Sequence, residues 1–372
     1  MIKVLYIVST LANTGPTNQL FNIVTNLDKD TFNPIILTLS PESEDSQLER
    51  FINANIEVDS LNLSRFKGML KGSHYLRRKV EELDPTLVHT QGLRADTLAA
   101  RNLKQYKKVT TLRNYPFHDY PMKFGKVKGL IMAYSHIKAF KYFDSPITCS
   151  ESLASLLETK IKERYKFIQN GVDINHYTFP TFENKESMRK KIKIPLNKKV
   201  FITVGSLISR KDPLTVIKAF IQSKAFDNSI LLIIGDGPLK KECQEVAKDY
   251  TNIIFTGQVE DVKDYLTASD YFVSASLSEG LPNTVLEALS VGLPCCLSNI
   301  EQHREILKLN KNAGILIETK SISEFAQSFS FIQEKDYNLV TSSARNIIID
   351  HLSANIMSRK YQDLYKKLVI SD

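Results

Sequence analysis

Long apolar runs are missing from this sequence, and this absence bears on its relation to membranes. No run approaches the roughly 18 or more apolar residues that a membrane-spanning helix needs. The apolar start from Met1 to Ser9 is short and is followed by a polar turn ending at Gly15. We therefore expect this start to be a first β-strand and not a signal peptide.

Metal-binding spacings are also missing. The only cysteines are Cys149, Cys243, Cys295 and Cys296, and none forms a C-x-x-C pair or a Cys/His ligand spacing. This pattern argues against a zinc site and predicts reduced, buried thiols in a cytoplasmic protein. A D-x-D pattern occurs at Asp28 and Asp30, but it lies in an expected helix-end turn. We expect no metal site.

The composition is that of a globular protein with an excess of positive charge. Of 372 residues, 42% are hydrophobic and 24% are charged, which excludes a disordered chain and leaves room for two domains. The net charge of +8 favours an acidic partner, either nucleic acid, an anionic membrane or a phosphorylated small molecule. No nucleic-acid-binding module is recognisable, so nucleic acid is the least favoured of the three.

Strand-like and helix-like patterns alternate along the whole chain. Short apolar runs predict strands at 4–8, 34–39, 87–90, 108–112 and 146–149, and then at 200–204, 230–235, 253–256, 271–274, 294–297 and 314–317. Repeated βα units predict an α/β fold with doubly wound parallel sheets. A polar passage at 177–199 interrupts the pattern and is the expected linker between two Rossmann-like halves.

Residues 278–287, Ser-Glu-Gly-Leu-Pro-Asn-Thr-Val-Leu-Glu, connect an expected buried strand to an expected helix. Asn283 is the expected N-cap, and a helix start after a parallel strand is suited to a phosphate. Glu279 and Glu287 would bracket that phosphate, with a sugar on one side and a ribose on the other. The alternative is an ordinary capped helix with two surface glutamates.

Other turns at strand ends point to the same kind of ligand. Arg210 and Lys211 follow the strand at 200–204 and could neutralise a leaving diphosphate, although a solvated charged loop would look the same. Gly235 ends the next strand in a glycine turn that permits close backbone approach to a planar base. Gly15 and Pro16 open the first helix of the first half.

Residues 120–143 contain five lysines, no acidic residue and many apolar or aromatic side chains. A segment of this kind can lie on an anionic bilayer, but a core-facing stripe with a solvated back is an equal alternative. A second basic cluster consists of Arg65, Lys67, Lys71, Arg77, Arg78 and Lys79. His118, in a loop-like passage, is a candidate for contact with an acceptor.

Taken together, these motifs resemble the retaining glycosyltransferases of family 4, which have the GT-B fold. The resemblance rests on Gly205-x-Leu with Lys211, Gly235-Asp-Gly-Pro, Phe255-x-Gly257, residues 278–287 and Asn170-Gly-Val-Asp173. It implies two Rossmann-like domains facing across a cleft. Residues 1–176 would form the acceptor domain, completed by a C-terminal helix at about 350–372, and residues 177–349 would form the nucleotide-sugar domain.

The resemblance also implies roles for individual residues. Glu279 would face the donor sugar, Glu287 would hold the ribose hydroxyls, and Arg210 and Lys211 would bind the diphosphate, so Glu279, Arg210 and Lys211 are the expected catalytic residues. The full expected donor set is Gly15, Gly205, Arg210, Lys211, Gly235, Glu279, Gly280, Leu281, Pro282, Asn283, Thr284 and Glu287.

Three positions depart from the family pattern. Ser206 stands where an arginine is common, Arg113 stands where a histidine commonly follows the strand, and Gly15 is a single glycine where the family has a pair. Arg210 could substitute for the missing arginine, and Arg113 joins His118 as an expected acceptor contact.

The function implied is retaining transfer of a hexose or N-acetylhexosamine from a nucleotide diphosphate sugar, with a UDP-sugar favoured, to a lipid-linked or cell-surface glycan. The resemblance implies that no cofactor or metal is needed. We expect a cytoplasmic protein, peripheral on the inner face of the cell membrane. The alternatives are a nucleotide-sugar epimerase of the same fold and a non-catalytic partner of another transferase.

Overall fold

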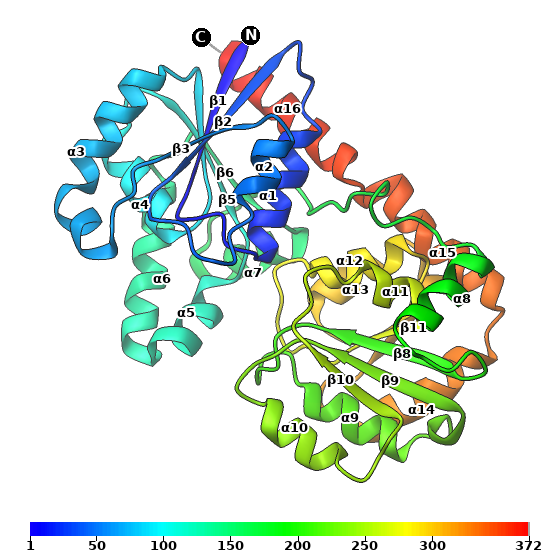
Figure 1. Cartoon of the computed structure of the whole chain (residues 1–372). Coiled ribbons are helices and arrows are strands. Elements are labelled where there is room, and N and C mark those ends of the chain that lie inside the picture. Colours follow the sequence, from blue (N-terminus) through cyan, green and yellow to red (C-terminus); the bar gives the residue numbers. More distant parts are fainter. Residues whose placement is uncertain (371–372) are drawn as a thin grey trace. The chain divides into compact units, whose positions relative to one another are not determined.

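The computed structural model describes residues 1–370, apart from the side chains of Arg65, Phe66 and Met69, so the Arg65 side chain of the second basic cluster lies outside the described residues. The chain forms two compact units. The first consists of Met1–Gly171 together with the C-terminal residues from Ala354, and the second is Val172–Ser353. Each unit has one parallel sheet between helices, which confirms the predicted α/β class (Figure 1).

The first unit has a seven-stranded sheet in the order β3-β2-β1-β4-β5-β6-β7. Its strands are β1 (Ile2–Val8), β2 (Phe32–Thr38), β3 (Glu57–Ser60), β4 (Leu87–Thr90), β5 (Lys107–Leu112), β6 (Ser145–Thr148) and β7 (Lys166–Phe167). Its helices are α1 (Gly15–Thr25), α2 (Leu48–Asn53), α3 (Arg65–Leu83), α4 (Leu93–Asn102), α5 (Pro116–Phe124), α6 (Lys126–Phe140), α7 (Glu151–Ile161) and α16 (Ala354–Ile370).

Strand β1 shows how the first unit distributes its core over both faces of the sheet. Side chains alternate along a strand, so Val4 and Tyr6 face one side while Leu5 and Ile7 face the other. The first pair belongs to a cluster with α1 and α16, and the second to a cluster with α3 and α4. A strand buried on both faces reads as a continuous apolar run, which is why the sequence reveals β1 clearly.

Helix α16 is bound to the first unit by a buried polar network. The Tyr365 hydroxyl lies 2.6 Å from Nδ1 of His89 and 3.1 Å from the Tyr6 hydroxyl. Thr111 joins Nε2 of His89 to the Tyr361 hydroxyl at distances of 2.8 and 2.9 Å. These contacts satisfy polar groups that would otherwise be costly to bury, so α16 is part of the first unit's interior.

The second unit has a six-stranded sheet in the order β10-β9-β8-β11-β12-β13. Its strands are β8 (Lys199–Val204), β9 (Ser229–Ile234), β10 (Ile253–Gly257), β11 (Tyr271–Ser274), β12 (Cys295–Ser298) and β13 (Gly314–Ile317). Its helices are α8 (Phe182–Lys191), α9 (Pro213–Gln222), α10 (Lys240–Ala247), α11 (Lys263–Ala268), α12 (Asn283–Ser290), α13 (Glu301–Leu307), α14 (Ile322–Phe331) and α15 (Tyr337–Ile347).

The prediction that residues 177–199 form a linker between the two halves is wrong. This passage contains helix α8 and lies entirely within the second unit. Arg189 of α8 is buried and its guanidinium lies 2.6 Å from the carboxylate of Asp270, which also accepts a hydrogen bond from Lys185 at 2.8 Å. The helix is polar because it attaches through this ion-pair cluster and not through an apolar stripe.

Candidate functional site

Two loops of the second unit meet because their strands are neighbours. Strands β8 and β11 pair in parallel, although β9 and β10 lie between them in the sequence. The strand order therefore reverses between β8 and β11, and ligands of open α/β sheets bind at such a switch point. The loop after β8 carries Arg210 and Lys211, and the loop after β11 carries Glu279.

Glu279 lies between the two cations in this structure. Its Oε2 is 2.9 Å from Nη1 of Arg210, and its Oε1 is 2.5 Å from Nζ of Lys211. The same Nη1 donates to the carbonyl of Ser278 at 2.6 Å, and the backbone N–H of Leu277 donates to the carbonyl of Arg210 at 2.8 Å. The structure thus brings together the three residues expected to be catalytic.

The environment of Glu279 keeps its carboxylate ionised. Only 7% of the residue is exposed, and this burial by itself raises the pKa. The charges of Lys211 and Arg210, with hydrogen bonds from Lys211 and Ser276, outweigh burial and lower the pKa of Glu279 to about 2. At neutral pH the cluster therefore holds two positive charges and one negative charge.

Helix α12 begins one residue earlier than expected. It starts at Asn283, and the N-cap position is occupied by Pro282, whose carbonyl accepts hydrogen bonds from Val285 and Leu286. The expectation that Asn283 caps this helix is therefore wrong, because the extended backbone of Pro282, with φ of −74° and ψ of 109°, already ends the turn.

The half-buried residues of α12 show which face is available to a ligand. Asn283, Thr284 and Glu287 are half-buried, whereas Val285 and Leu286 are buried in the core. Spacings of three and four residues place Thr284 and Glu287 with Asn283 on one side of the helix. Gly280, Leu281 and Pro282 lie buried in the turn before it.

Backbone packing explains the two glycines that end β8 and β9. A Cβ atom added at Gly235 would lie 2.0 Å from the carbonyl oxygen of Gly205, and Gly235 has φ of +136°. A side chain at Gly235 would therefore displace the loop that carries Arg210. The Lys211 side chain extends past Gly205, where an added Cβ would lie 3.5 Å from Cε.

His303, which no sequence motif indicated, lies beside the cluster. His303 is buried on α13 and donates from Nδ1 to the carbonyl of Ser298 at 2.8 Å. The Ser298 hydroxyl in turn donates to the carbonyl of Ser276 at 2.5 Å. Burial lowers the pKa of His303 to about 4, an effect that Lys211 reinforces and the Ser298 hydrogen bond and Glu279 oppose. The imidazole is neutral at pH 7.

The feature that points to His303 is its place after a strand of the sheet. The residue follows β12, which pairs with β11, so the two adjacent strands deliver Glu279 and His303 to the same edge of the sheet. A single histidine without ligand spacing carries no such indication until the strand order is known.

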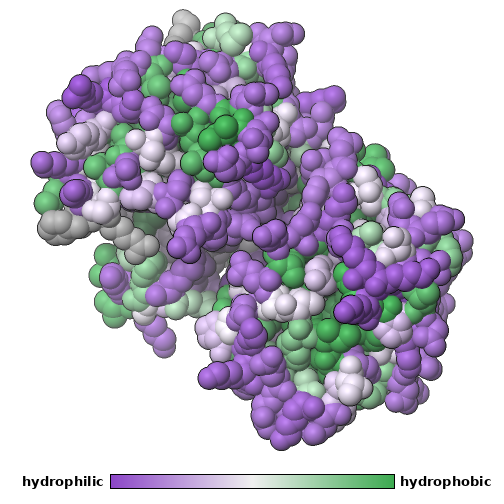
Figure 2. All heavy atoms as spheres, in the orientation of Figure 1, coloured by the Kyte–Doolittle hydropathy of each residue, from purple (hydrophilic) through white to green (hydrophobic). Residues whose placement is uncertain are grey.

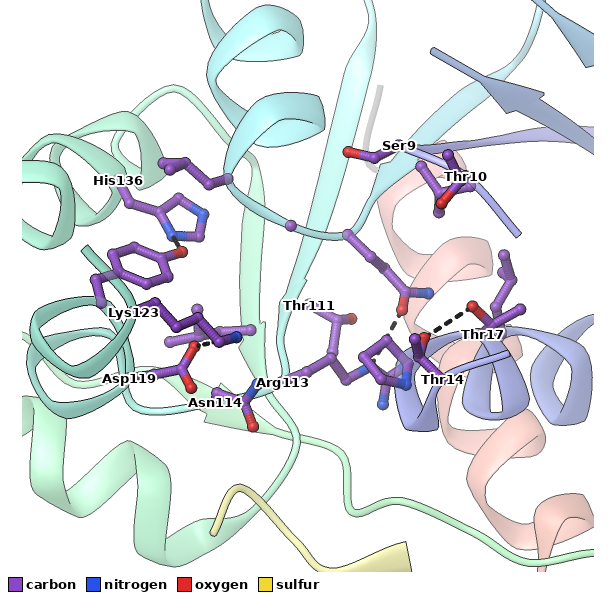
Figure 3. A pocket seen from close by; sticks show the side chains of 18 of the residues that line it. Ser9, Thr10, Thr14, Thr17, Thr111, Arg113, Asn114, Asp119, Lys123 and His136 are labelled. Carbon is purple, nitrogen blue, oxygen red and sulfur yellow. Dashed lines mark hydrogen bonds and ion pairs between the residues drawn. The ribbon is translucent and has the colours of Figure 1, made fainter. Parts of the chain in front are cut away.

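A cavity of about 350 Å³ lies in the first unit at the carboxyl ends of β1, β4 and β5. Because strand order reverses between β1 and β4, this cavity also lies at a switch point. Arg113 lines the cavity. Thr14 and Thr17, at the start of α1, lie on one side of it, and Asp119 and Lys123 of α5 lie on the other (Figure 3).

Two other residues singled out in the sequence lie close to this cavity but do not line it. Gly15 is the first residue of α1, whose neighbours Thr14 and Pro16 are in the wall. His118 is exposed on α5, and its neighbour Asp119 is in the wall instead.

A buried polar chain ends at this cavity. Asp96 lies 2.6 Å from Nε2 of His136, and Nδ1 of His136 lies 2.7 Å from the Tyr120 hydroxyl. Figure 3 shows His136 at the cavity. Asp96 also accepts a hydrogen bond from Thr90. The chain connects β4, α4, α5 and α6 and fixes Tyr120 in the cavity wall.

Two features are absent from the described part of the chain, residues 1–370. Within this part of the chain, no group of three or more His, Cys, Asp or Glu side chains could hold a metal ion. None of the helices in the described part is long and apolar enough to cross a bilayer.

Comparison with known proteins identifies the class. The family described as Glycosyl transferases group 1 matches residues 184–347, and Glycosyltransferase Family 4 matches residues 14–176. An Escherichia coli UDP-Gal:alpha-D-GlcNAc-diphosphoundecaprenol alpha-1,3-galactosyltransferase is 30% identical over 83% of this chain and 82% of its own. The Escherichia coli O-antigen biosynthesis glycosyltransferase WclY is 23% identical over 99% of both chains.

Solved structures confirm the predicted fold. The Anabaena protein HepE in complex with UDP-glucose has a TM-score of 0.81 at 16% identity, over 99% of this chain and 100% of its own. Sucrose-phosphate synthase from Thermosynechococcus elongatus has a TM-score of 0.82 at 14% identity, over 100% of both chains. The fold is GT-B. The chain belongs to the group 1 glycosyltransferases, as its motifs predicted.

Proposed function

We propose that this glycosyltransferase moves a hexose or N-acetylhexosamine from a UDP-sugar to a glycan acceptor, with retention of the anomeric configuration and without a metal ion. The observation that carries the proposal is the convergence of Glu279, Arg210 and Lys211 at the switch point of the second unit. A cluster with one surplus positive charge is suited to a diphosphate.

The choice of a UDP-sugar draws on the comparisons. UDP-Gal appears in the name of the Escherichia coli galactosyltransferase, and UDP-glucose is bound in the HepE structure. The half-buried face of α12 supports a ribose contact, because Glu287 lies one turn beyond the start of the helix. The N–H groups and positive dipole end of that start favour the neighbouring phosphate.

In the proposed reaction the bond between the sugar C1 and the diphosphate oxygen breaks, and the acceptor oxygen bonds to C1 on the same face. The acceptor's hydroxyl proton passes to the departing diphosphate. Arg210 and Lys211 stabilise the negative charge that develops on the diphosphate, a role that a metal ion fills elsewhere. The ionised Glu279 stabilises positive charge on the sugar ring and positions both cations.

We propose a lipid-linked acceptor at the inner face of the cell membrane. Diphosphoundecaprenol-linked sugars are named for the Escherichia coli relative and for a Campylobacter jejuni N-acetylgalactosaminyltransferase that is 24% identical over 90% of this chain. Both names describe transfer to a sugar that is linked to diphosphoundecaprenol, which supports a membrane-bound substrate for this chain.

The surface of α5 and α6 supports the same proposal. Apolar side chains there are exposed, among them Met122, Phe124, Val127, Ile131 and Tyr134, and Val127 is 76% exposed. Lysines at 123, 126 and 128 lie in the same segment, and Figure 2 shows apolar beside polar surface at this end of the first unit. Apolar groups flanked by lysines suit an anionic bilayer surface.

The opposite face of α6 is buried, with Ala133, His136, Ile137 and Phe140 packed in the first unit. The segment thus has the core-facing stripe of one alternative, and its exposed face, apolar as well as cationic, supports our proposal of the other.

A two-stage experiment tests the proposal. A thermal-shift screen of nucleotide sugars identifies the donor, because a ligand that binds only the folded protein raises Tm. The donor is then incubated with and without polyprenyl diphosphate-linked sugars. We expect a new glycosidic product only with an acceptor. A new sugar from the donor alone would indicate an epimerase, and binding without turnover of any acceptor would indicate a non-catalytic partner.

A further inference from the structure

Arg113 is a cation whose hydrogen-bond partners are neutral. Its Nε donates to Oε1 of Gln91 at 3.1 Å, and its Nη1 donates to Oδ1 of Asn170 at 2.6 Å. Among residues 1–370 it forms no ion pair, and its Nη2 is buried without a hydrogen-bond partner. The first unit therefore holds an uncompensated positive charge with a donor still available.

The orientation of Gln91 follows from its contact with Arg113. A guanidinium only donates, so Gln91 must present its oxygen to Arg113 and turn its amide nitrogen away. Gln91 is 6% exposed, and its Nε2 is also buried with no partner in the described part of the chain. Leaving buried donors unpaired is costly, so two such donors on residues that contact each other indicate a missing acceptor.

Both residues line the 350 Å³ cavity at the β1/β4 switch point. The wall also contains Thr14 and Pro16 at the start of α1, where the helix dipole favours an anion. The one carboxylate in the wall, that of Asp119, is paired with Lys123 at 3.0 Å. Burial lowers the pKa of His89, and the positive charge of Arg113 lowers it further.

We propose that Arg113 and Gln91 form a binding site for a phosphate oxyanion of the acceptor. The inference rests on the proposed function for the identity of the acceptor but not for the presence of the anion site. An unpaired guanidinium N–H and an unpaired amide N–H, on two residues in contact with each other, suit two oxygens of one phosphate group. The source within the reaction is the phosphate that links the acceptor sugar to its lipid.

The test uses Gln91→Glu in the full chain. The new carboxylate would pair with Arg113, supply the missing charge and remove the Gln91 donor, so the variant should fold at least as stably as wild type. Calorimetry with inorganic pyrophosphate is carried out on protein saturated with UDP, so that the Arg210 and Lys211 site is already occupied. We expect pyrophosphate to bind wild type and Gln91→Glu to weaken that binding about tenfold or more.

Gln105→Glu, an exposed position in the first unit, adds the same charge elsewhere and should leave the affinity for pyrophosphate unchanged. Arg113→Gln should lose binding as Gln91→Glu does. Equal affinity for pyrophosphate in wild type and Gln91→Glu would overturn the site.

Geranyl diphosphate and a UDP-sugar distinguish the two phosphates that the site could bind, which are the phosphate of the lipid-linked acceptor and the diphosphate of the donor. Displacement of pyrophosphate by geranyl diphosphate, but not by a UDP-sugar, is expected. Displacement by the UDP-sugar would overturn the assignment to the acceptor. Because binding is measured without turnover, loss of the anion site and failure of the transfer reaction remain separate results.

Discussion

The Nζ atom of Lys211 lies 2.5 Å from Oε1 of Glu279, although the two residues are 68 positions apart in the sequence. The contact exists because β8 and β11 are neighbours in the sheet. The carboxylate therefore already pairs with Lys211 and Arg210 in the absence of a diphosphate. We expect Glu279 to affect the affinity for the donor and the rate of transfer in opposite ways.

Glu279→Gln should separate these two effects. Removing the negative charge leaves Arg210 and Lys211 unneutralised, so the affinity for UDP should rise several-fold. The rate of transfer should fall by about 10²- to 10³-fold, because stabilisation of the charged transition state is lost. Calorimetry with UDP and initial-rate measurements check both. An unchanged rate of transfer would refute the role of Glu279.

Acid should destabilise the second unit in part through His303. Its pKa is about 4 in the folded protein and 6.5 ordinarily, so the unfolded chain binds a proton between these values while the folded protein does not. Stability present above pH 6.5 is therefore lost as the pH falls toward 4, by about 3 kcal/mol in all. His303→Gln should show a shallower dependence of Tm on pH over this window. His351→Gln, at an exposed position of the second unit, should match wild type.

Gly235→Ala tests the backbone contact between the loops after β8 and β9. The added Cβ would meet the carbonyl of Gly205, so we expect the free energy of unfolding to fall by about 1–3 kcal/mol and UDP affinity to fall with it. Gly257→Ala is the matched control. Gly257 also has positive φ, of +74°, but open space around it, so only the conformational cost of about 1–2 kcal/mol applies and UDP affinity should persist.

The exposed face of α6 should control membrane binding. Val127 and Ile131 are 76% and 65% exposed and lie one turn apart. Replacing both with Glu should reduce binding to vesicles containing phosphatidylglycerol by about tenfold or more, because two apolar contacts are lost and two negative charges are added. The control is the replacement of Phe182 and Leu339, which are exposed in the second unit, with Glu. Equal vesicle binding by wild type and the α6 variant would contradict the proposed membrane surface.

Much of the fold was predictable because its strands are buried on both faces. All six strands of the second unit appear in the sequence as short apolar runs, as β9 (Ser-Ile-Leu-Leu-Ile-Ile) illustrates. Strands β3 and β7 were not predicted, because β3 is a polar edge strand and β7 has only two residues. Helix α8 was missed because its attachment depends on Arg189 and a distant Asp270.

The site was predictable where a residue belongs to a local motif. Arg210, Lys211 and Glu279 each follow a predicted strand, so only their convergence required the structure. His303 and the chain from Asp96 to Tyr120 could not be predicted, because their roles arise from strand order and burial. The predicted N-cap of α12 differs from the observed one by a single residue, because Pro282 and Asn283 are both suited to a helix start.

The central claim is that Arg210 and Lys211 hold the diphosphate of the donor. Calorimetric titration of UDP into wild type and into the Arg210→Gln, Lys211→Gln double variant tests it most directly, with Lys218→Gln, Lys224→Gln as a control of equal charge at exposed positions. We predict that the first double variant binds UDP at least about 100-fold more weakly and that the control binds it as wild type does. Equal affinity of wild type and the Arg210, Lys211 variant for UDP would contradict the claim.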